Sequence, residues 1–396
     1  MGYAPGFLFD IIILCTLMLA QWRISRMVLQ RAGSRGSPRV RWIRAFLLAG
    51  GALIAAGILL SFPRVAEQDL LPNGLSAWLR AAANLWAFSS TGAYIVYVVV
   101  SAAGKRLPSP PVNPGRRRWM RMAGGALIGA PFAVTGYGVF VERTNFRVRE
   151  IDIPFAGLPE ELTGLRMVQL SDIHLSLFLS ERELAKVIDA ANEARAHLAL
   201  VTGDLISQHG DPLDACLRQL SRLRTDAGTL GCLGNHEIYA EAEDYATEEG
   251  ARLGIRFLRN AAQQLRFGKA VLNFAGVDYQ RIGWKKTYLR GAERLVAPGA
   301  LNVLLSHNPD VFPVAAHKGY DLTLSGHTHG GQVAVEILHQ SISLARFFTP
   351  FVYGCYRMRG LHGPSCVYVT RGIGTIGMPA RVGAPPEITV LRLKKA

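Results

Sequence analysis

The chain has 396 residues and a formal net charge of +15, from 44 Lys and Arg against 29 Asp and Glu. Most of the excess lies in residues 1–150, which carry 18 basic and 5 acidic residues, whereas residues 151–396 carry 26 and 24. A nucleic-acid-binding protein is expected to gather basic residues on its folded domain, and the C-terminal part is nearly neutral. The charge distribution therefore argues against nucleic acid as a partner.

The first 148 residues contain four apolar runs that suit a membrane. Three carry no formal charge and approach the roughly 20 residues that span the hydrocarbon core of a bilayer. The fourth, near the N-terminus, is shorter and contains Asp10. A buried core helix is the alternative for one such run, but three in succession with Arg at their ends disfavour it. We therefore predict an all-α membrane domain over residues 1–148, with about four transmembrane helices at about 7–22, 45–62, 81–104 and 122–141.

Basic residues between these runs predict the orientation of the chain. The linkers 23–44 and 105–121 are rich in Arg, whereas the linker 63–80 has two Arg against Glu67 and Asp69. Basic linkers stay on the cytoplasmic side of a membrane. We therefore predict a multi-pass protein of the cytoplasmic (inner) membrane, with the domain from residue 149 onward on the extracytoplasmic side.

Two short patterns leave alternatives open. The run Arg116–Arg121, followed by small and apolar residues, is similar to a twin-arginine export signal, but an ordinary basic flank of a membrane helix is the favoured explanation. Both explanations export the domain. Cys355 and Cys366 are close enough in sequence to pair in an oxidising compartment, although spacing alone does not fix a disulfide.

From about residue 149 short apolar runs alternate with amphipathic segments. The expected strands are 166–170, 198–202, 229–233, 271–276, 301–306 and 322–325, and the expected helices are 181–196, 213–223, 242–253 and 287–295. Such alternation is typical of an α/β domain whose sheets are covered by helices. Two later apolar runs, 365–370 and 387–393, indicate a second sheet. We thus predict one α/β domain over residues 149–396.

Five short motifs follow these apolar runs. They are Ser-Asp-Ile-His at 171–174, Gly-Asp at 203–204, Gly-Asn-His-Glu at 234–237, Ser-His-Asn-Pro at 306–309 and Gly-His-Thr-His-Gly-Gly-Gln at 326–332. Each places a carboxylate, amide or imidazole where the carboxyl ends of sheet strands build ligand sites. Any one motif is weak, because a lone histidine at a strand end is more often structural than a ligand. All five in this order predict one converging metal site.

The side chains of these motifs suit divalent cations. Asp172 and His174 are one residue apart on an extended strand end, so they point to the same side and can hold one cation. Asp204 can bridge two cations through its two oxygens. The seven candidate ligands are Asp172, His174, Asp204, Asn235, His307, His327 and His329. They offer nitrogen and oxygen but no thiolate, a set typical of Mn, Fe, Zn or Mg sites.

Residues Ile151 to Leu393 resemble the calcineurin-like metallophosphoesterase superfamily, whose motifs Asp-x-His, Gly-Asp, Gly-Asn-His-Glu/Asp, His and Gly-His-x-His run in this order. The resemblance implies an αββα sandwich with a dinuclear centre. One cation would be held by Asp172, His174, Asp204 and His329, and the other by Asp204, Asn235, His307 and His327. His236 would be catalytic without being a ligand, lying beside the scissile phosphate and assisting the leaving oxygen. The segments 370–375 and 384–388 are similar to the membrane-associated branch, which includes a transmembrane protein and bacterial phosphodiesterases exported by twin-arginine signals.

The resemblance implies a metal-dependent phosphoric ester hydrolase. Two divalent metal ions and a bridging hydroxide would cleave a phosphodiester, phosphomonoester or pyrophosphate bond without a protein nucleophile. The apolar and aromatic segment Val335–Gly363 fits contact with a lipid tail, although a cover over the sheet edge is the alternative. Membrane lipids and a phosphorylated, lipid-linked substrate are therefore expected partners, and no obligate protein partner is expected.

Three alternatives to this function stay open. An enzyme of lipid A metabolism, similar to UDP-2,3-diacylglucosamine pyrophosphatase, conflicts with an outward-facing domain because its nucleotide-sugar precursors are cytoplasmic. A phosphoprotein phosphatase would use the same metals in a shallower site. A non-catalytic membrane sensor or transporter is disfavoured by the complete ligand set and by the near absence of charge within the apolar runs.

Overall fold

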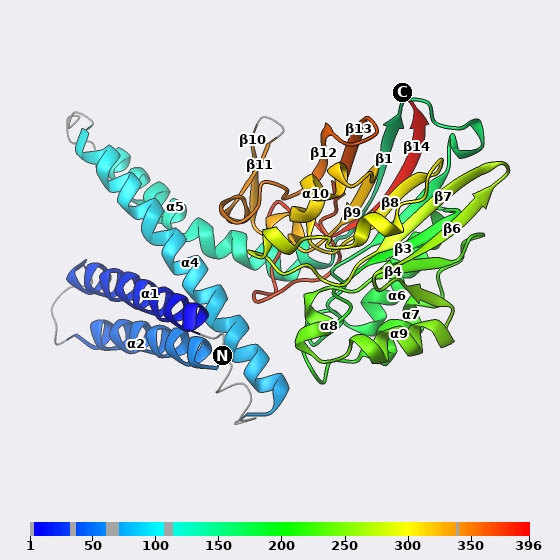
Figure 1. The fold of residues 1–396 in the computed structure, drawn as a ribbon. Helices are drawn as coiled ribbons and strands as arrows, with labels where there is room; N and C mark the ends of the chain where they lie inside the picture. Colours follow the sequence, from blue (N-terminus) through cyan, green and yellow to red (C-terminus); the bar gives the residue numbers. More distant parts are fainter. Residues whose placement is uncertain (1–3, 32–36, 61–70, 107–113, 338–339) are drawn as a thin grey trace. The chain divides into compact units, whose positions relative to one another are not determined.

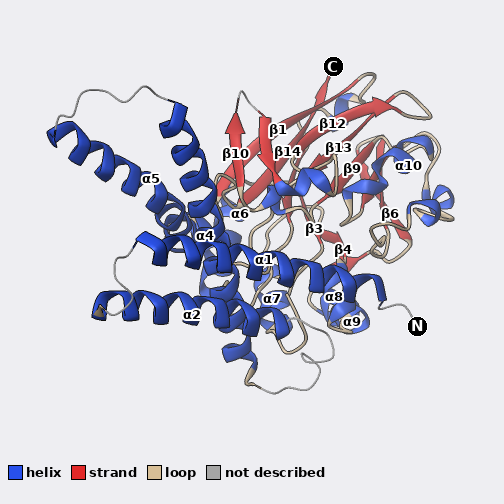
Figure 2. Ribbon diagram, turned by 90° about the vertical axis from the view of Figure 1, so that its left-hand side faces the viewer, coloured by secondary structure: helices blue, strands red, loops and turns tan. Residues whose placement is uncertain are grey.

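The computed structural model describes residues 4–31, 37–60, 71–106, 114–337 and 340–396. The chain divides into two compact units, one of Met1–Val139 with Gly377–Pro379, the other of Phe140–Ile376 with Ala380–Ala396. Figures 1 and 2 show that the first unit is helical and that the second contains the strands.

The first unit consists of four helices in its described part: α1 (Ala4–Arg31), α2 (Pro38–Leu59), α4 (Asn73–Arg106) and α5 (Pro114–Phe140). Three described segments are long and apolar enough to cross a membrane, namely Pro38–Leu59, Gly74–Gly104 and Pro114–Thr144. They contain the predicted spans 81–104 and 122–141 and most of the predicted span 45–62, whose last two residues lie outside the described residues. The remaining run, 7–22, lies in α1, so a fourth span stays a prediction. The run Arg116–Arg121 forms the first turns of α5.

Small residues let two of these helices approach closely. A Cβ atom on Gly57 of α2 would lie 2.3 Å from the Cβ of Ala83 in α4, and one on Gly50 would meet the ring of Trp86. Between α4 and α5, the Ser89 hydroxyl donates a 3.0 Å hydrogen bond to that of Thr135. Small residues and hydroxyl bonds at helix contacts are typical of membrane helices, where lipid offers no hydrophobic driving force for association.

In its described residues, the second unit contains two six-stranded sheets and a two-stranded ribbon. The order in the first sheet is β1 (Arg147–Phe155), β14 (Glu387–Lys395), β2 (Arg166–Leu170), β3 (Leu198–Thr202), β4 (Thr229–Cys232) and β5 (Ile255–Phe257), with only β14 and β2 antiparallel. In the second sheet the order is β12 (Gly354–Arg359), β13 (Pro364–Val369), β9 (Leu322–Ser325), β8 (Leu301–Leu305), β7 (Ala270–Gly276) and β6 (Ala261–Phe267). The ribbon pairs β10 (Ala334–Ile337) with β11 (Gln340–Ser343).

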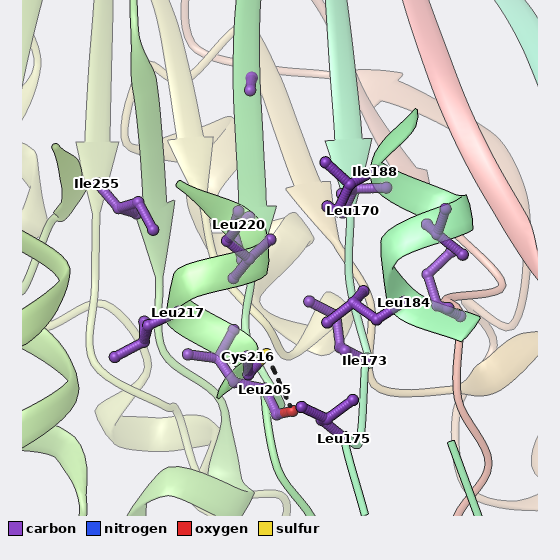
Figure 3. Packing of buried hydrophobic residues seen from close by; sticks show 14 of the residues in the cluster. Leu170, Ile173, Leu175, Leu184, Ile188, Leu205, Cys216, Leu217, Leu220 and Ile255 are labelled. Atoms are coloured by element: carbon purple, nitrogen blue, oxygen red, sulfur yellow. Dashed lines mark hydrogen bonds between the residues drawn. The ribbon is translucent and has the colours of Figure 1, made fainter. Parts of the chain in front are cut away.

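Apolar clusters hold these layers together. The first packs β2 and β3 against α6 (Glu181–Glu193) and α7 (Leu213–Leu220), as Figure 3 shows for Leu170, Leu184 and Leu217. A second cluster joins side chains of both sheets, including Leu200 of β3 and Val303 of β8. Others place α10 (Phe312–His317) against the second sheet. Mixed α/β sheets preceded by a helical region therefore agree with the predicted fold class.

Helix α6 illustrates how local sequence sets an element. Ser180 accepts a hydrogen bond from the backbone N–H of Glu183, while the Glu183 carboxylate accepts one from the backbone of Ser180. This capping box satisfies two N–H groups that a helix start would leave unpaired. The buried residues Leu184, Val187, Ile188 and Ala191 follow the helical spacing that places them on one face, toward β2 and β3.

Two sequence expectations are settled here. The predicted helix 287–295 is wrong: the chain forms two short 3-10 turns, Lys285–Thr287 and Ala292–Leu295, and Gly291 between them has a φ of 79°, in the left-handed region that ends a helix. Cys355 in β12 and Cys366 in β13 lie on neighbouring strands, and both thiols are free.

Candidate metal centre

The candidate ligands follow the carboxyl ends of five strands from the two sheets. Asp172 and His174 follow β2, Asp204 follows β3 and Asn235 follows β4, while His307 follows β8 and the pair His327 and His329 follows β9. Six of the seven are buried, and His327 is half-buried. The structure thus gathers all seven predicted residues at one place.

Backbone geometry at these strand ends is unusual. Asp172, His174, Asp204, His327 and His329 have φ angles of 49°, 48°, 55°, 73° and 52°. Non-glycine residues rarely adopt this left-handed region, because it costs of order 1 kcal/mol or more and persists only where surrounding contacts enforce it. A Cβ on Gly203 would lie 2.6 Å from the backbone nitrogen of Gly234, so two of the loops approach closely enough to require glycine.

Asp204 is the residue that two groups of ligand atoms share. Its Oδ2 lies 2.9 Å from Nε2 of His307 and 3.5 Å from Nε2 of His174. One group of potential metal-ligating atoms contains Asp204, His307 and His327, and another contains His174, Asp204 and His236. A third group, Asp172, His174 and His329, shares His174 with the second. A carboxylate between two such groups is placed to bridge two cations.

Several donor atoms in this cluster are buried without a hydrogen-bond partner. They are Asp172 Oδ2, His174 Nε2, Asn235 Oδ1 and His307 Nε2. Although His307 Nε2 lies near Asp204, this approach lacks hydrogen-bond geometry. Buried polar atoms without partners are costly, and bound divalent cations would satisfy these four atoms. The residues therefore fit a divalent metal, with nitrogen and oxygen donors as predicted.

Hydrogen bonds orient the histidines. Nδ1 of His307 lies 2.7 Å from the carbonyl oxygen of Thr202, and since a carbonyl only accepts, this nitrogen carries the proton and Nε2 faces Asp204. Nδ1 of His174 lies 3.1 Å from the hydroxyl of Ser207. Such contacts on the outer ring nitrogen fix the orientation of metal-binding histidines.

Glu237, the last residue of the Gly-Asn-His-Glu motif, holds the loop after β3 to the loop after β4. Its buried carboxylate accepts hydrogen bonds from the backbone N–H groups of Asp204 (3.0 Å), Leu205 (2.7 Å) and Gly234 (2.7 Å). The sequence motifs predict no role for this residue. Its position three residues after Gly234, at the start of helix α8 (Asn235–Tyr239), was the available signal, because a glutamate there caps a helix.

Three of the four candidate histidine ligands are already in the neutral state that metal binding requires. Burial lowers the pKa of His174 and of His327 to about 3 and that of His329 well below its usual value, so these imidazoles are neutral. Burial would lower the pKa of His307 too, but the adjacent Asp204 charge outweighs it and raises that pKa to about 10. Burial raises the pKa of Asp172 to about 6. Ligands bind metals in their deprotonated forms, so a cation would displace the His307 proton.

His236 lies at the edge of the cluster. Its ring is 4.7 Å from that of His174 and 5.4 Å from that of Tyr239, each edge to face. Its backbone N–H donates to Asp204 Oδ1 at 3.0 Å, and its Nδ1 donates to the carbonyl oxygen of Ser207 at 2.5 Å. Nε2 of His236 has no hydrogen-bond partner among the residues that the structure describes. Although atoms of His236 fall within one of the ligand groups, its role beside the substrate stays a prediction.

Comparison with known proteins decides the family. A family model described as calcineurin-like phosphoesterase matches residues 165–331, which include all five motifs except the final Gln332. The uncharacterized metallophosphoesterase YkuE of Bacillus subtilis is 31% identical over 296 residues, covering 70% of this chain and 97% of the relative. The chain belongs to the calcineurin-like metallophosphoesterase family. It is therefore a metal-dependent phosphoesterase hydrolase.

Two further relatives extend the match. The transmembrane protein with metallophosphoesterase domain of Danio rerio is 29% identical over 417 residues, covering 98% of this chain and 89% of the relative. The protein of that name from Bos taurus is 28% identical over 266 residues, covering 63% of this chain and 57% of the relative. Three described segments are also apolar enough to span a membrane. Together with these relatives, they confirm the predicted metallophosphoesterase and transmembrane features.

Proposed function

We propose that this metallophosphoesterase is a membrane-anchored enzyme with a dinuclear centre that hydrolyses a phosphate ester of a lipid-linked substrate. Residues 1–148 would form the membrane domain, and residues 149–396 an αββα sandwich that carries the site. The observation that supports the dinuclear centre is the position of Asp204, whose carboxylate lies between His174 and His307. One cation would be held by Asp172, His174, Asp204 and His329, and the other by Asp204, Asn235, His307 and His327.

Each group of residues has a role in this proposal. When bound, two divalent cations supply a nucleophilic water at neutral pH and charge stabilisation for phosphoryl oxygens. The neutral imidazoles and the ionised Asp204 hold the cations, and Glu237 fixes the backbone that carries Asp204. The free Nε2 of His236 would lie beside the leaving oxygen and stabilise or protonate it. No protein nucleophile is needed.

The lipid part of the proposal is supported by exposed aromatic residues near the last motif. In the predicted segment Val335–Gly363, the side chains of Phe347 and Phe348 are 85% and 69% exposed, while Val352 is buried. A Cβ on Gly331 would lie 2.3 Å from Oγ of Ser343, so the stretch that leads to these phenylalanines packs on the metal-binding loop. The side chains of Ile342 and Leu344 lie outside the described residues. Exposed phenylalanines next to the site suit an acyl chain.

Hydrolysis assays with the purified full-length chain test this function. Metal-loaded protein should cleave bis-p-nitrophenyl phosphate and lipid phosphodiesters, lose both activities in chelator and recover them with Mn²⁺. Activity on phosphopeptides alone would instead favour a phosphoprotein phosphatase. No hydrolysis of any phosphate ester by the metal-loaded chain would contradict the proposal.

Location is proposed from the basic linkers. The predicted extracytoplasmic position requires that a reporter fused after Ala396 be active outside the cytoplasm. Alkaline phosphatase fused there should be active. Green fluorescent protein fused there should be dark when the general secretion route exports it. The reverse pattern would place the site in the cytoplasm, where nucleotide-linked lipid precursors are available.

A further inference from the structure

The loop after β7 connects the metal centre to a surface that the proposed chemistry does not use. It covers residues 279–290. At its start, the ring of Tyr279 lies 5.6 Å from that of His327 and 6.1 Å from that of His307. The residues that follow are exposed from Arg281 to Thr287. The loop thus begins at the site and continues into solvent.

Hydrogen bonds at its base hold this loop in place. The side-chain amide of Asn308, the residue after His307, donates to the carbonyl oxygen of Gln280 at 2.6 Å and to the hydroxyl of Tyr288 at 3.3 Å. The backbone N–H of Leu289 donates to the Gln280 side chain at 3.0 Å. Tyr288 and Leu289 are buried. Both ends of the exposed part are therefore anchored beside His307.

The exposed part combines apolar and aromatic surface with positive charge. Trp284 is 61% exposed and Ile282 is 50% exposed. The guanidinium of Arg281 lies 5.7 Å from the Trp284 ring centroid, so charge and indole are adjacent. The other five tryptophans of the chain all precede residue 120, which leaves Trp284 alone in the second unit. An exposed tryptophan at a loop tip contributes nothing to the core of this unit.

Charge in this loop differs from that of the surrounding domain. Residues 279–290 contain four basic residues, Arg281, Lys285, Lys286 and Arg290, and no Asp or Glu. Among the described residues none of these four forms an ion pair. By contrast, the acidic residues on either side of the loop are already paired, Asp278 with Arg259 and Glu293 with Lys318. The loop therefore presents unneutralised charge on a domain that is otherwise balanced.

We propose that residues 281–290 dock on an anionic lipid surface, with Trp284 and Ile282 in the interfacial region and the basic side chains on lipid phosphates. Indole at the bilayer interface next to Lys and Arg is the usual composition of a peripheral membrane contact. Lipid is the occupant because the same chain carries three described segments apolar enough to lie in a bilayer. Docking would place the Tyr279 side of the metal centre at the headgroup layer. The inference rests on the proposed membrane anchoring but not on hydrolysis.

Trp284 itself reports on docking. Full-length chain and its Trp284→Phe variant are placed in nanodiscs of phosphatidylcholine with or without phosphatidylglycerol, each made with brominated acyl chains. Subtracting the two emission spectra isolates Trp284 from the five other tryptophans. We expect Trp284 emission to be quenched in the anionic discs and to be less quenched in the neutral ones.

Charge reversal tests the basic residues. Lys285→Glu with Lys286→Glu should abolish the quenching, whereas Arg266→Glu with Lys269→Glu should keep it. The control pair changes the same net charge at exposed positions by the β6–β7 turn, at the opposite end of β7. Thermal unfolding of each variant verifies that it is folded.

Any of three results would overturn the docking. The first is an unquenched Trp284 in anionic discs, and the second is equal quenching in both double variants. The third is a raised KM for bis-p-nitrophenyl phosphate in Lys285→Glu/Lys286→Glu without any quenching in the parent chain, which would assign the charges to a soluble anionic substrate. Failure of the proposed hydrolysis would be seen separately, as a parent chain that does not cleave the chromogenic diester.

Discussion

Arg381 donates a hydrogen bond of 2.9 Å from a terminal guanidinium nitrogen to the backbone carbonyl oxygen of His329. Arg381 is fully buried and also donates to the carbonyl oxygens of Arg371, Gly374 and Ala384. No carboxylate among the described residues pairs with it. The guanidinium therefore holds the last metal-binding loop to the segment 371–384 through backbone carbonyls.

Replacing Arg381 by Lys should weaken metal binding. An ammonium cannot reproduce the planar set of donors, so several of these carbonyls, including that of His329, would lose their partners and the loop would be held less firmly. Loss of such outer contacts lowers metal affinity by about 10- to 100-fold. Competition with a fluorescent chelator measures this. Arg392→Lys, at an exposed ion pair with Asp152, is the control, and equal affinities in the two variants would refute the positioning role.

Glu237→Gln should destabilise the fold more than a matched exposed change. The buried carboxylate accepts three backbone N–H groups, and a glutamine amide would place its own N–H₂ against one of them. Leaving a buried donor unsatisfied costs about 1–3 kcal/mol. Chemical denaturation of metal-free protein measures the difference. Glu183→Gln in the capping box of α6 should cost less, and a larger loss there than at position 237 would contradict this prediction.

Stability of the metal-free protein should fall as pH rises above neutrality. His307 has a pKa raised from its usual 6.5 to about 10, chiefly by Asp204 acting against burial. A raised folded-state pKa contributes stability that is complete below 6.5 and is lost as pH rises toward 10. The lowered pKa values of His174 and His327 act only at acidic pH.

Melting temperatures in chelator between pH 7 and pH 10 measure this effect. The parent chain should lose stability across that range, and His307→Gln should lose less because it lacks the titrating group. Parallel curves for the two proteins would show that the Asp204 and His307 pair does not titrate as proposed.

His236→Ala separates catalysis from metal binding. If the free Nε2 of His236 acts on the leaving oxygen, turnover should fall by about 10²- to 10⁴-fold, the usual contribution of general acid–base catalysis, while metal content stays unchanged. Substrates with a good leaving group such as p-nitrophenolate should be affected less. Loss of one metal equivalent on this substitution would instead identify His236 as a ligand, in agreement with its place near His174 and Asp204.

The positions of the ligands could be predicted from sequence because their signals are local. Apolar runs at 166–170, 198–202 and 322–325 coincide with β2, β3 and β9, and each motif follows its strand directly. The predicted helix 287–295 is wrong because an amphipathic pattern does not reveal that Gly291 adopts a positive φ. The residues around Gly291 form a loop with two short 3-10 turns instead.

Arg381 could not be predicted, because its role depends on contacts between distant segments. Its partner His329 is 52 residues away in sequence, and no periodic pattern marks residue 381. The pairing of β1 with β14 could not be predicted for the same reason, because it brings Ile151 opposite the distant Leu391. Tertiary contacts of this kind have no local sequence signal.

Titration of metal-free protein with Mn²⁺, with hydrolysis of bis-p-nitrophenyl phosphate recorded at each step, tests the shared role of Asp204 most directly. The parent chain should bind about two equivalents, with activity appearing as the second is filled, and Asp204→Asn should lose both tight binding and activity. Asp278→Asn, which breaks a partly exposed ion pair, should behave as the parent. Full activity at one equivalent, or two tightly bound equivalents in Asp204→Asn, would contradict a dinuclear centre bridged by Asp204.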